Sequence, residues 1–301
     1  MNKKNVSIHN RDLAITNPGK VLYPRSGLTK VQMLEYYSRI ARFILPHLKN
    51  RALTLKRYPE GVDHEFFFEK RCPPSHPDWV ETAEIPYGEN KKIKYCLVNN
   101  LETLIWVANL ASLELHVPLA KAKTHQTPDT VVFDLDPGVG ADIVDCGRVA
   151  LVLKDLLAKQ KLACWAKTSG KKGLHLLVPL NSKGVTFEQT KRFSRAVAEI
   201  MERHYPELVT ADMDKVLRPG KVFINWSQND RSKTTVCVYS LRAADQPYVS
   251  FPLEWRQVEQ LVKLKKPAGF PVLYSEAVTR AEKEGDLFLK VLSQKQKLPN
   301  I

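Results

Sequence analysis

The sequence predicts an α/β fold in which a central antiparallel or mixed sheet packs against a second lobe. Apolar runs of strand length are one reason: residues 131–133 lead into a segment that Pro137-Gly138 ends. Amphipathic helical patterns at about 30–48, 142–159 and 187–204 are another. At 301 residues, the chain can bury a full core and form one large domain or two lobes.

The composition points to a polyanionic partner. Lys and Arg number 46 against 32 Asp and Glu, which gives a net charge of +14 and makes nucleic acid the first candidate. The five cysteines include no Cys-x-x-Cys pair, so neither a zinc site nor a disulfide framework is indicated, and we expect a reduced intracellular protein. The first residues carry no apolar signal core, and no apolar run approaches membrane-spanning length.

The first helix is predicted after a polar N-terminal stretch. Thr29 is a suitable N-cap for a helix over about 30–48, whose first turn carries Lys30. A cation opposes the helix dipole there, but a basic residue beside exposed helix N–H groups can form an anion pocket, and Lys20 lies ten residues upstream. The residues alone leave two interpretations open, a phosphate site or two solvated lysines.

An aromatic segment follows a predicted strand at 53–59. Three consecutive rings, Phe66, Phe67 and Phe68, cannot all face the core of a strand, so at least one must point outward or cover another lobe. Exposed rings among basic residues suit stacking on bases, whereas two rings in the core and one at a lobe interface would be structural. Both interpretations stay open. A basic hairpin loop at 86–95 and an apolar helix at 101–113 are expected next.

Asp134 and Asp136 stand two residues apart at the end of the predicted strand. Residues i and i+2 of a strand point to the same face, roughly 6–7 Å apart, so the carboxylates project together with no cation beside them in sequence. A divalent cation relieves such repulsion, and hard oxygen ligands favour Mg²⁺ or Mn²⁺. The alternative is a solvated strand end.

Strands and helices continue to alternate after these acids. Ser169-Gly-Lys-Lys-Gly173 separates strands at 163–168 and 174–179, and its glycines let a backbone approach phosphate oxygens. Taken singly, a histidine in a strand, such as His175, is more often a satisfied core residue. The remaining expected elements are helices at about 142–159, 187–204, 254–264 and 276–293, a polar loop at 210–220, and strands at 221–228 and 234–242 that form a hairpin in the sheet of Asp134.

Across about residues 10–290, the order of motifs resembles the polymerase domain of the ligase D-type end-joining proteins, a branch of the archaeo-eukaryotic primase superfamily. The motifs are Asn17-Pro-Gly-Lys20, Thr29-Lys30, Gly61-Val-Asp63, Phe67-Phe-Glu-Lys70, Glu114-Leu-His-Val-Pro118, Phe133-Asp-Leu-Asp-Pro-Gly138, Thr168-Ser-Gly170, Lys172-Gly-Leu-His175, Trp226-Ser-Gln-Asn229 and Tyr239-Ser-Leu-Arg242. The resemblance implies an α/β (α+β), two-lobed primase-polymerase fold with an RRM-like catalytic sheet. A single domain over 1–301 would comprise an N-terminal lobe at about 1–125, a catalytic core at about 126–265 and a C-terminal helical tail at 266–301, with substrate in a basic cleft between the lobes.

By this resemblance the protein is a template-directed DNA repair polymerase of non-homologous end joining. It would add nucleotides, ribonucleotides in preference, to a primer 3′-OH at gaps and broken ends, with two metal ions per site and Mn²⁺ preferred to Mg²⁺. The implied partners are NTPs or dNTPs, double-stranded DNA ends, gapped DNA with a 5′-phosphate, Ku and a DNA ligase. The implied location is a prokaryotic cytoplasm beside the nucleoid, with no membrane.

The resemblance also gives roles to individual residues. Asp134 and Asp136 correspond to the metal-bridging acids and form the catalytic group with the residue at 225. Nucleotide binding falls to Lys56, His116, Ser169, Gly170, Lys172, His175, Gln228 and Arg242. Lys20 and Lys30 match the pocket for a 5′-phosphate, Phe67 and Phe68 match rings that pack against template bases, and Lys215 and Arg218 lie in the loop that handles primer or template.

One position departs from the family pattern. The third aspartate of its Val-Phe-x-Asp-Trp strand is Asn225 here, so two divalent ions would face two carboxylates instead of three. We therefore expect intact nucleotide and DNA binding with strongly reduced nucleotidyl transfer. A catalytically weak DNA-end and nucleotide-binding module is the alternative. A metal-dependent nuclease or phosphatase would fit the two acids but leaves the loop at 169–173 and Arg242 unexplained.

Overall fold

The computed structural model describes residues 3–88, 90–265 and 270–299. Contacts group the chain into two compact units, which are described separately below. The first unit consists of Met1–Pro118, Val236–Val249 and Val272–Asp286, and the second of Leu119–Thr235, Ser250–Pro271 and Leu287–Ile301. Each unit is discontinuous, so this division differs from the three consecutive segments that the sequence predicts. Residues 266–269 and 300–301 of the predicted C-terminal tail lie outside the described residues.

A mixed six-stranded sheet forms the centre of the second unit, as predicted. Its order is β13-β14-β10-β12-β11-β18, and only β13 and β14 pair in parallel. The strands are β10 (Thr130–Pro137), β11 (Trp165–Thr168), β12 (Leu174–Pro179), β13 (Val209–Thr210), β14 (Val222–Asn225) and β18 (Pro252–Leu253). The helices are α3 (Ile143–Lys159), α4 (Phe187–His204) and α5 (Trp255–Leu264), with 3-10 turns η1 (Ala122–Thr124), η2 (Lys215–Leu217), η3 (Trp226–Gln228) and η4 (Leu289–Leu292).

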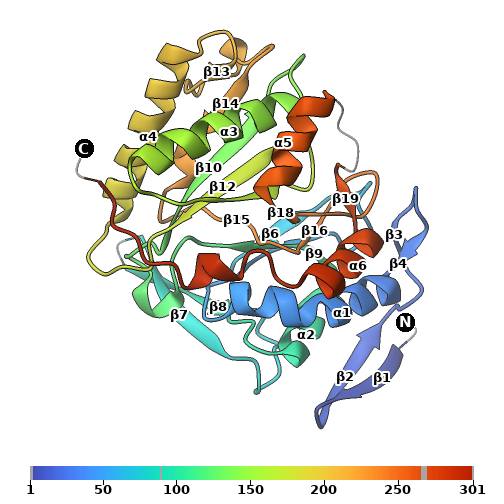
Figure 1. Ribbon diagram of the computed structural model, residues 1–301. Helices are drawn as coiled ribbons and strands as arrows, with labels where there is room; N and C mark the ends of the chain where they lie inside the picture. The colour runs from blue at the N-terminus through green and yellow to red at the C-terminus, as the bar shows by residue number, and fades with distance from the viewer. Residues whose placement is uncertain (1–2, 89, 266–269, 300–301) are drawn as a thin grey trace. The chain divides into compact units, whose positions relative to one another are not determined.

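One face of this sheet carries the hydrophobic core. Phe133 and Leu135 of β10 pack in one cluster with buried residues of α3, α4 and α5, and Figure 1 shows these helices beside β10 and β12. Because side chains alternate along a strand, Asp134 and Asp136 point to the opposite face. Packing of the helices therefore leaves both acids on the face that the core does not use.

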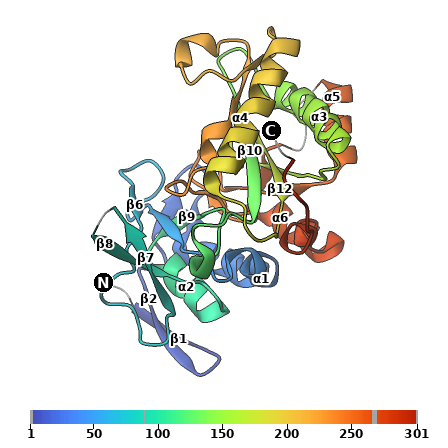
Figure 2. The same cartoon turned by 90° about the vertical axis from the view of Figure 1, so that its left-hand side faces the viewer.

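The first unit combines helices with several small sheets. Its helices are α1 (Lys30–Leu48), α2 (Leu101–Asn109) and α6 (Tyr274–Glu284). A four-stranded sheet has the order β15-β9-β5-β6, from β5 (Thr54–Arg57), β6 (Phe67–Glu69), β9 (Ser112–Val117) and β15 (Thr235–Val236), and a three-stranded sheet joins β16 (Leu241–Arg242), β17 (Tyr248–Val249) and β19 (Val272–Leu273). Three pairs complete the unit: β1 (Lys3–Ile8) with β2 (Arg11–Thr16), β3 (Val21–Tyr23) with β4 (Leu28–Thr29), and β7 (Thr82–Tyr87) with β8 (Lys91–Cys96); Figure 2 shows the first and last of them.

Capping fixes the predicted helix starts. Thr29 precedes α1, and its backbone N–H donates to the Gln32 side chain at 2.8 Å. Asp142 precedes α3, where its carboxylate accepts from the N–H of Val144 at 2.7 Å. Asp142 thereby satisfies a backbone donor that the first turn of α3 leaves without an intrahelical partner, whereas at α1 the Gln32 side chain accepts from the N-cap residue. Thr29 and Asp142 are the N-caps of the two helices, so both predictions are confirmed.

Two predicted elements were wrong. Strands at 221–228 and 234–242 do not form a hairpin in the sheet of Asp134, because η3 ends β14 and the later residues form β15 and β16 in other sheets. Tyr239, at φ +65°, interrupts the second segment, since the left-handed region is incompatible with a continuing strand. The helix predicted at 276–293 stops at Glu284, where Gly285 adopts φ +77°, and η4 follows.

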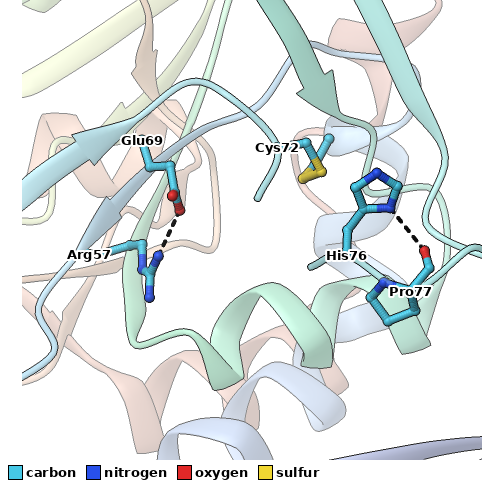
Figure 3. The surroundings of a disulfide bond; sticks show 6 residues. Arg57, Glu69, Cys72, His76 and Pro77 are labelled. Carbon is cyan, nitrogen blue, oxygen red and sulfur yellow. Dashed lines mark hydrogen bonds and ion pairs between the residues drawn. A yellow bond between two sulfur atoms is a disulfide. The ribbon is translucent and has the colours of Figure 1, made fainter. Parts of the chain in front are cut away.

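The expectation that the cysteines indicate no disulfide was also wrong for one pair. Cys72 and Cys96 are joined by a disulfide with a Cα–Cα distance of 4.9 Å, and Figure 3 shows its surroundings. The sequence shows no sign of the pair because the partners are 24 residues apart and meet only where the backbone N–H of Cys72 donates to the carbonyl of Lys94 in β8. Within the described residues, no helix is long and apolar enough to cross a membrane.

Candidate active site

Four polar side chains meet at the face of the second unit's sheet that lies opposite its hydrophobic core. Asp134 pairs across the ladder with His175 of β12 on one side and with Asn225 of β14 on the other. Its Oδ1 lies 3.2 Å from Nε2 of His175, and its Oδ2 accepts at 3.4 Å from the amides of both Asn225 and Gln228. Three residues far apart in the sequence are thus gathered around one carboxylate.

Asp134 is held as an anion although it is only 7% exposed. Burial pushes the pKa of its carboxyl upward, but the charge and hydrogen bond of His175 and the hydrogen bond from Gln228 outweigh burial, so the pKa is lowered. His175 is therefore explained as a polar partner of Asp134 rather than as a satisfied residue of the apolar core. Asp136 is exposed on the same face.

The donor set suits one divalent cation better than two. Asp134 and Asp136 supply two carboxylates on one face, which are the hard oxygen ligands that Mg²⁺ and Mn²⁺ take. Asn225 turns its Nδ2 donor toward Asp134, while its Oδ1 accepts from Ser227 at 2.7 Å and Ser227 accepts from Nζ of Lys233 at 2.6 Å. No group of three or more His, Cys, Asp or Glu side chains with metal-binding geometry occurs in the described part of the chain.

The loop at 169–173 lies against the strand of the two acids. Ser169 turns its hydroxyl inward, where it accepts from the N–H groups of Lys171 at 3.3 Å and Gly173 at 3.1 Å. Gly170 adopts φ +74°, and a Cβ on Gly173 would meet the carbonyl oxygen of Leu135 at 2.0 Å. Glycine at 173 therefore lets the loop approach β10 closely, and Lys172 is left exposed at the loop surface.

The loop of Lys215 and Arg218 also reaches the C-terminal end of this strand. The Arg218 guanidinium lies 3.7 Å from the centroid of the Phe223 ring and donates to the Met213 carbonyl at 2.8 Å. A Cβ on Gly138 would meet the carbonyl oxygen of Arg218 at 1.9 Å. Gly138, directly after Asp136-Pro137, therefore allows this loop to pack on the end of β10.

The first unit contains a separate cationic group around one acid. The carboxylate of Glu114 on β9 lies 2.8 Å from Nε2 of His116 and 3.6 Å from both Nζ of Lys56 and Nε of Arg242. It also accepts from the backbone N–H of Ala243 at 3.1 Å. We call Lys56, Glu114, His116 and Arg242 the Glu114 cluster.

The cluster shifts the protonation of its members. Burial alone would raise the pKa of Glu114, but the hydrogen bond from His116 and the charges of Arg242, His116 and Lys56 lower it to about 2. Burial lowers the pKa of His116, and Glu114 only partly opposes this. Burial is also the main cause that lowers the pKa of Lys56. Glu114 is therefore an anion and His116 is neutral at neutral pH.

The aromatic segment is exposed throughout. Phe66, Phe67 and Phe68 are 49%, 44% and 55% exposed, so none of the three rings belongs to a core. Nζ of Lys56 lies 4.0 Å from the Phe66 centroid, and the Arg57 guanidinium lies 5.1 Å from that of Phe67. The interpretation with two rings in the core is thereby excluded. Exposed rings beside cations have the chemistry that stacking on bases requires.

Lys20 and Lys30 are adjacent. The N–H of Lys30 donates to the Lys20 carbonyl at 2.8 Å, at the start of α1. Nζ of Lys30 is buried and donates to the carbonyl and hydroxyl of Thr16 at 2.7 and 2.9 Å, whereas Nζ of Lys20 pairs with Glu60 at 2.7 Å. The interpretation as two solvated lysines is therefore excluded, because Lys30 is not solvated. A role of Lys20 and Lys30 in binding a 5′-phosphate stays a prediction.

The predicted residues fall into two groups that the chain order does not separate. Asp134, Asp136, Ser169, Gly170, Lys172, His175, Lys215, Arg218, Asn225 and Gln228 lie in the second unit, and Lys20, Lys30, Lys56, Phe67, Phe68, His116 and Arg242 lie in the first. Sequence reasoning missed Glu114 and Lys233. Glu114 could have been found from the sequence, because it stands two residues before His116 in a strand and so shares its face. Nothing in the sequence points to Lys233.

Comparison with known proteins adds an independent observation. The family model described as LigD, primase-polymerase domain, matches residues 29–288. The multifunctional non-homologous end joining protein LigD of Mycolicibacterium smegmatis is 41% identical over 91% of this chain, and the bifunctional non-homologous end joining protein LigD of Bacillus subtilis is 32% identical over 95% of it. The chain spans only 35% and 45% of the lengths of these two relatives.

A solved structure is similar over nearly the whole chain. The polymerase domain of Mycobacterium tuberculosis ligase D in complex with DNA superimposes with a TM-score of 0.86 at 37% identity. The match covers 94% of this chain and 99% of that one. The predicted mixture of helices and sheet in an archaeo-eukaryotic primase fold is therefore confirmed.

Proposed function

The chain belongs to the LigD primase-polymerase family, whose domains are metal-dependent nucleotidyltransferases, and we propose that it acts as a repair polymerase of non-homologous end joining. In this proposal it adds nucleotides, ribonucleotides in preference, to a primer 3′-OH at gaps and broken ends under the direction of a template. The family match supports the reaction class, and the net charge of +14 supports a nucleic-acid substrate.

The observation that carries the proposal is the charged, 7%-exposed Asp134 beside Asp136 at the end of β10. A divalent cation held by these two carboxylates would offset phosphate charge and lower the pKa of the primer hydroxyl. We propose Mn²⁺ as the preferred ion. His175 and Gln228 keep Asp134 ionised and oriented, which is what a ligand carboxylate requires.

The other groups have proposed roles in binding. Cations of the Glu114 cluster suit the triphosphate of a nucleotide, as do Lys172 and the backbone of the loop at 169–173. Lys20 and Lys30 suit a terminal 5′-phosphate, because lysine contacts to phosphate give salt-sensitive attachment without sequence readout. The exposed Phe67 and Phe68 suit unpaired template bases. Lys215 and Arg218 suit the primer or template strand.

The partners and the location are proposed from the names of the relatives alone. The LigD proteins of M. smegmatis and B. subtilis are named for non-homologous end joining. Ku and a DNA ligase are the partners that we propose, with action in the cytoplasm beside the nucleoid.

A second candidate function is favoured by Asn225. Its amide donates toward Asp134, where the family pattern has an acid, so one negative charge of the metal site is missing. The chain could then act as a catalytically weak module that binds DNA ends and nucleotides. We propose that both kinds of binding are intact and that nucleotidyl transfer is strongly reduced.

A labelled gapped duplex with a 5′-phosphate, incubated with Mn²⁺ and NTPs, tests these alternatives. Elongation of the primer supports the polymerase, retention of the duplex without elongation supports the binding module, and shortening would mean a nuclease and contradict both. Asp134→Ala is the matched variant and should abolish elongation while the duplex is still retained. If the Asp134→Ala variant still elongated the primer, the proposed role of Asp134 and Asp136 in metal binding and catalysis would be wrong.

A further inference from the structure

Glu114 occupies an unusual position for an acid. Its side chain is fully buried, yet basic side chains from three strands converge on its carboxylate: Lys56 of β5, His116 of β9 and Arg242 of β16. Among the described residues, no other acid forms an ion pair with any of these three. The positions of the three groups therefore depend on one carboxylate.

The carboxylate is itself fixed. Oε1 of Glu114 accepts from the N–H of Ala243, the residue directly after Arg242, while Oε2 takes the hydrogen bond from His116. Ser112 and Leu113 precede Glu114 in β9 and are fully buried, so the strand has no freedom to withdraw the acid. A carboxylate anchored at a backbone N–H and buried in this way can hold flexible cationic side chains in a fixed arrangement.

The charges of the cluster leave an excess that suits an anion. With His116 neutral, the cluster carries two positive charges, on Lys56 and Arg242, and one negative charge, on Glu114. Lys56 lies close to Oε1 of Glu114 and Arg242 close to Oε2 of the same carboxylate, so without Glu114 they would repel each other in a partly desolvated site. Glu114 therefore keeps two like charges together while one net positive charge remains.

We propose that Glu114 is a positioning residue of the nucleotide site, which holds Lys56, His116 and Arg242 in the arrangement that binds the triphosphate. This inference rests on the proposed function, because it assumes that these three side chains contact a nucleotide. Glu114 itself contacts no phosphate, since a carboxylate would repel it. Its effect is transmitted through the three groups that it holds.

Binding of a fluorescent ATP analogue, measured by anisotropy without DNA, tests the proposal on the full chain. Glu114→Gln keeps the shape of the side chain and removes its charge, and we expect the Kd to rise by about tenfold or more, as for other buried charged hydrogen bonds. In primer extension, the KM for the nucleotide should rise more than kcat falls. Lys56→Met should weaken binding as well, and the double variant should be little weaker than the poorer single variant, because without Glu114 the contribution of Lys56 is already largely lost.

Two controls separate positioning from a general loss of stability. Glu102→Gln alters another buried acid of the first unit, which contacts His9 at 3.3 Å, and should leave the Kd unchanged. Should Glu114→Gln fail to fold, as judged by near-ultraviolet circular dichroism, Glu114→Asp retains the charge but shortens the side chain, and its Kd should still rise by several-fold. Additive effects of Glu114→Gln and Lys56→Met, or a Kd equal to that of the parent in a folded Glu114 variant, would overturn the inference. If the parent itself binds no nucleotide, the proposed function fails instead.

Discussion

The side-chain amide of Asn225 donates a 3.4 Å hydrogen bond to the carboxylate of Asp134, directly across the β10–β14 ladder. The resemblance of the sequence led us to expect a third acid at this position, and the contact puts a neutral donor there. A carboxylate there would instead repel Asp134, and a divalent cation would relieve that repulsion. We therefore expect the residue at position 225 to influence both the metal affinity and the catalytic rate.

We expect Asn225→Asp to raise the rate of primer extension with Mn²⁺ by at least about tenfold, because each 1.36 kcal/mol of added transition-state stabilisation gives a factor of ten. A second effect concerns stability. In the presence of a chelator, the variant should melt at a lower temperature than the parent, and Mn²⁺ should raise its melting temperature by more. Equal rates and equal metal-dependent shifts in the two proteins would show that the amide does not limit the site.

Gly173 gives a prediction about how the loop at 169–173 is held. A Cβ at this position would lie 2.0 Å from the backbone oxygen of Leu135, and neither backbone can yield without moving β10 or β12. We expect Gly173→Ala to lower the free energy of unfolding by about 1–3 kcal/mol or more, as overpacking does. Denaturant unfolding measures this.

Gly19→Ala is the matched control for that experiment. A Cβ on Gly19 meets nothing within 4 Å, so its unfolding free energy should change by no more than about 0.5 kcal/mol. If Gly173→Ala were as stable as Gly19→Ala, the close approach of the loop to β10 would be incorrect.

The motifs of the sequence predicted most of the acidic face because strand geometry is local. Asp134 and Asp136 share a face by their spacing, and the helices at 143–159 and 187–204 could be recognised from caps and apolar periodicity. His175 could not be assigned from the sequence, because its meaning depends on the pairing of β12 with β10. Long-range register is not encoded in any single segment.

The failures have related causes. The predicted hairpin at 221–242 looked regular in composition, but η3 and the positive φ of Tyr239 direct the chain out of the sheet. Cys72 and Cys96 carry no motif that relates them, and tertiary placement alone makes them partners. Glu114 was visible in the sequence only as a strand residue, since the roles of Lys56 and Arg242 around it depend on two other strands.

Lys30 gives a prediction about pH. Burial, together with the nearby charges of Lys20 and Arg57, lowers the pKa of Lys30 from the usual 10.5 to about 8. Its charged form is therefore disfavoured in the folded protein, and this cost to folding is present below pH 8 and disappears as the pH rises toward 10.5. The positive charge available for a 5′-phosphate is lost as the pH rises through the folded pKa of about 8.

Comparing gapped DNA with and without a 5′-phosphate separates the contribution of the Lys30 charge from general DNA binding. The ratio of the two affinities should fall as the pH rises from 7 to 9, because the phosphate remains doubly charged while Lys30 loses its proton. Fluorescence anisotropy at constant ionic strength measures both affinities. A ratio that stays constant up to pH 10 would mean either that Lys30 does not bind the phosphate or that it titrates as an ordinary lysine.

The last prediction concerns the Cys72–Cys96 disulfide, which joins the segment after β6 to the end of β8 and so fixes the β7–β8 hairpin beside the aromatic segment. Closing a loop of this length stabilises the folded state by about 3.5 kcal/mol in the chain-entropy model. Cys72→Ser combined with Cys96→Ser should therefore lower the melting temperature, and limited proteolysis should cut first within 72–96, while a reductant should give the same pattern in the parent. Cys146→Ser is the control, since Cys146 is a buried free cysteine of the second unit and its replacement should leave the cleavage pattern of that segment unchanged. Identical proteolysis of the oxidised parent and the double variant would show that strand pairing alone fixes the hairpin.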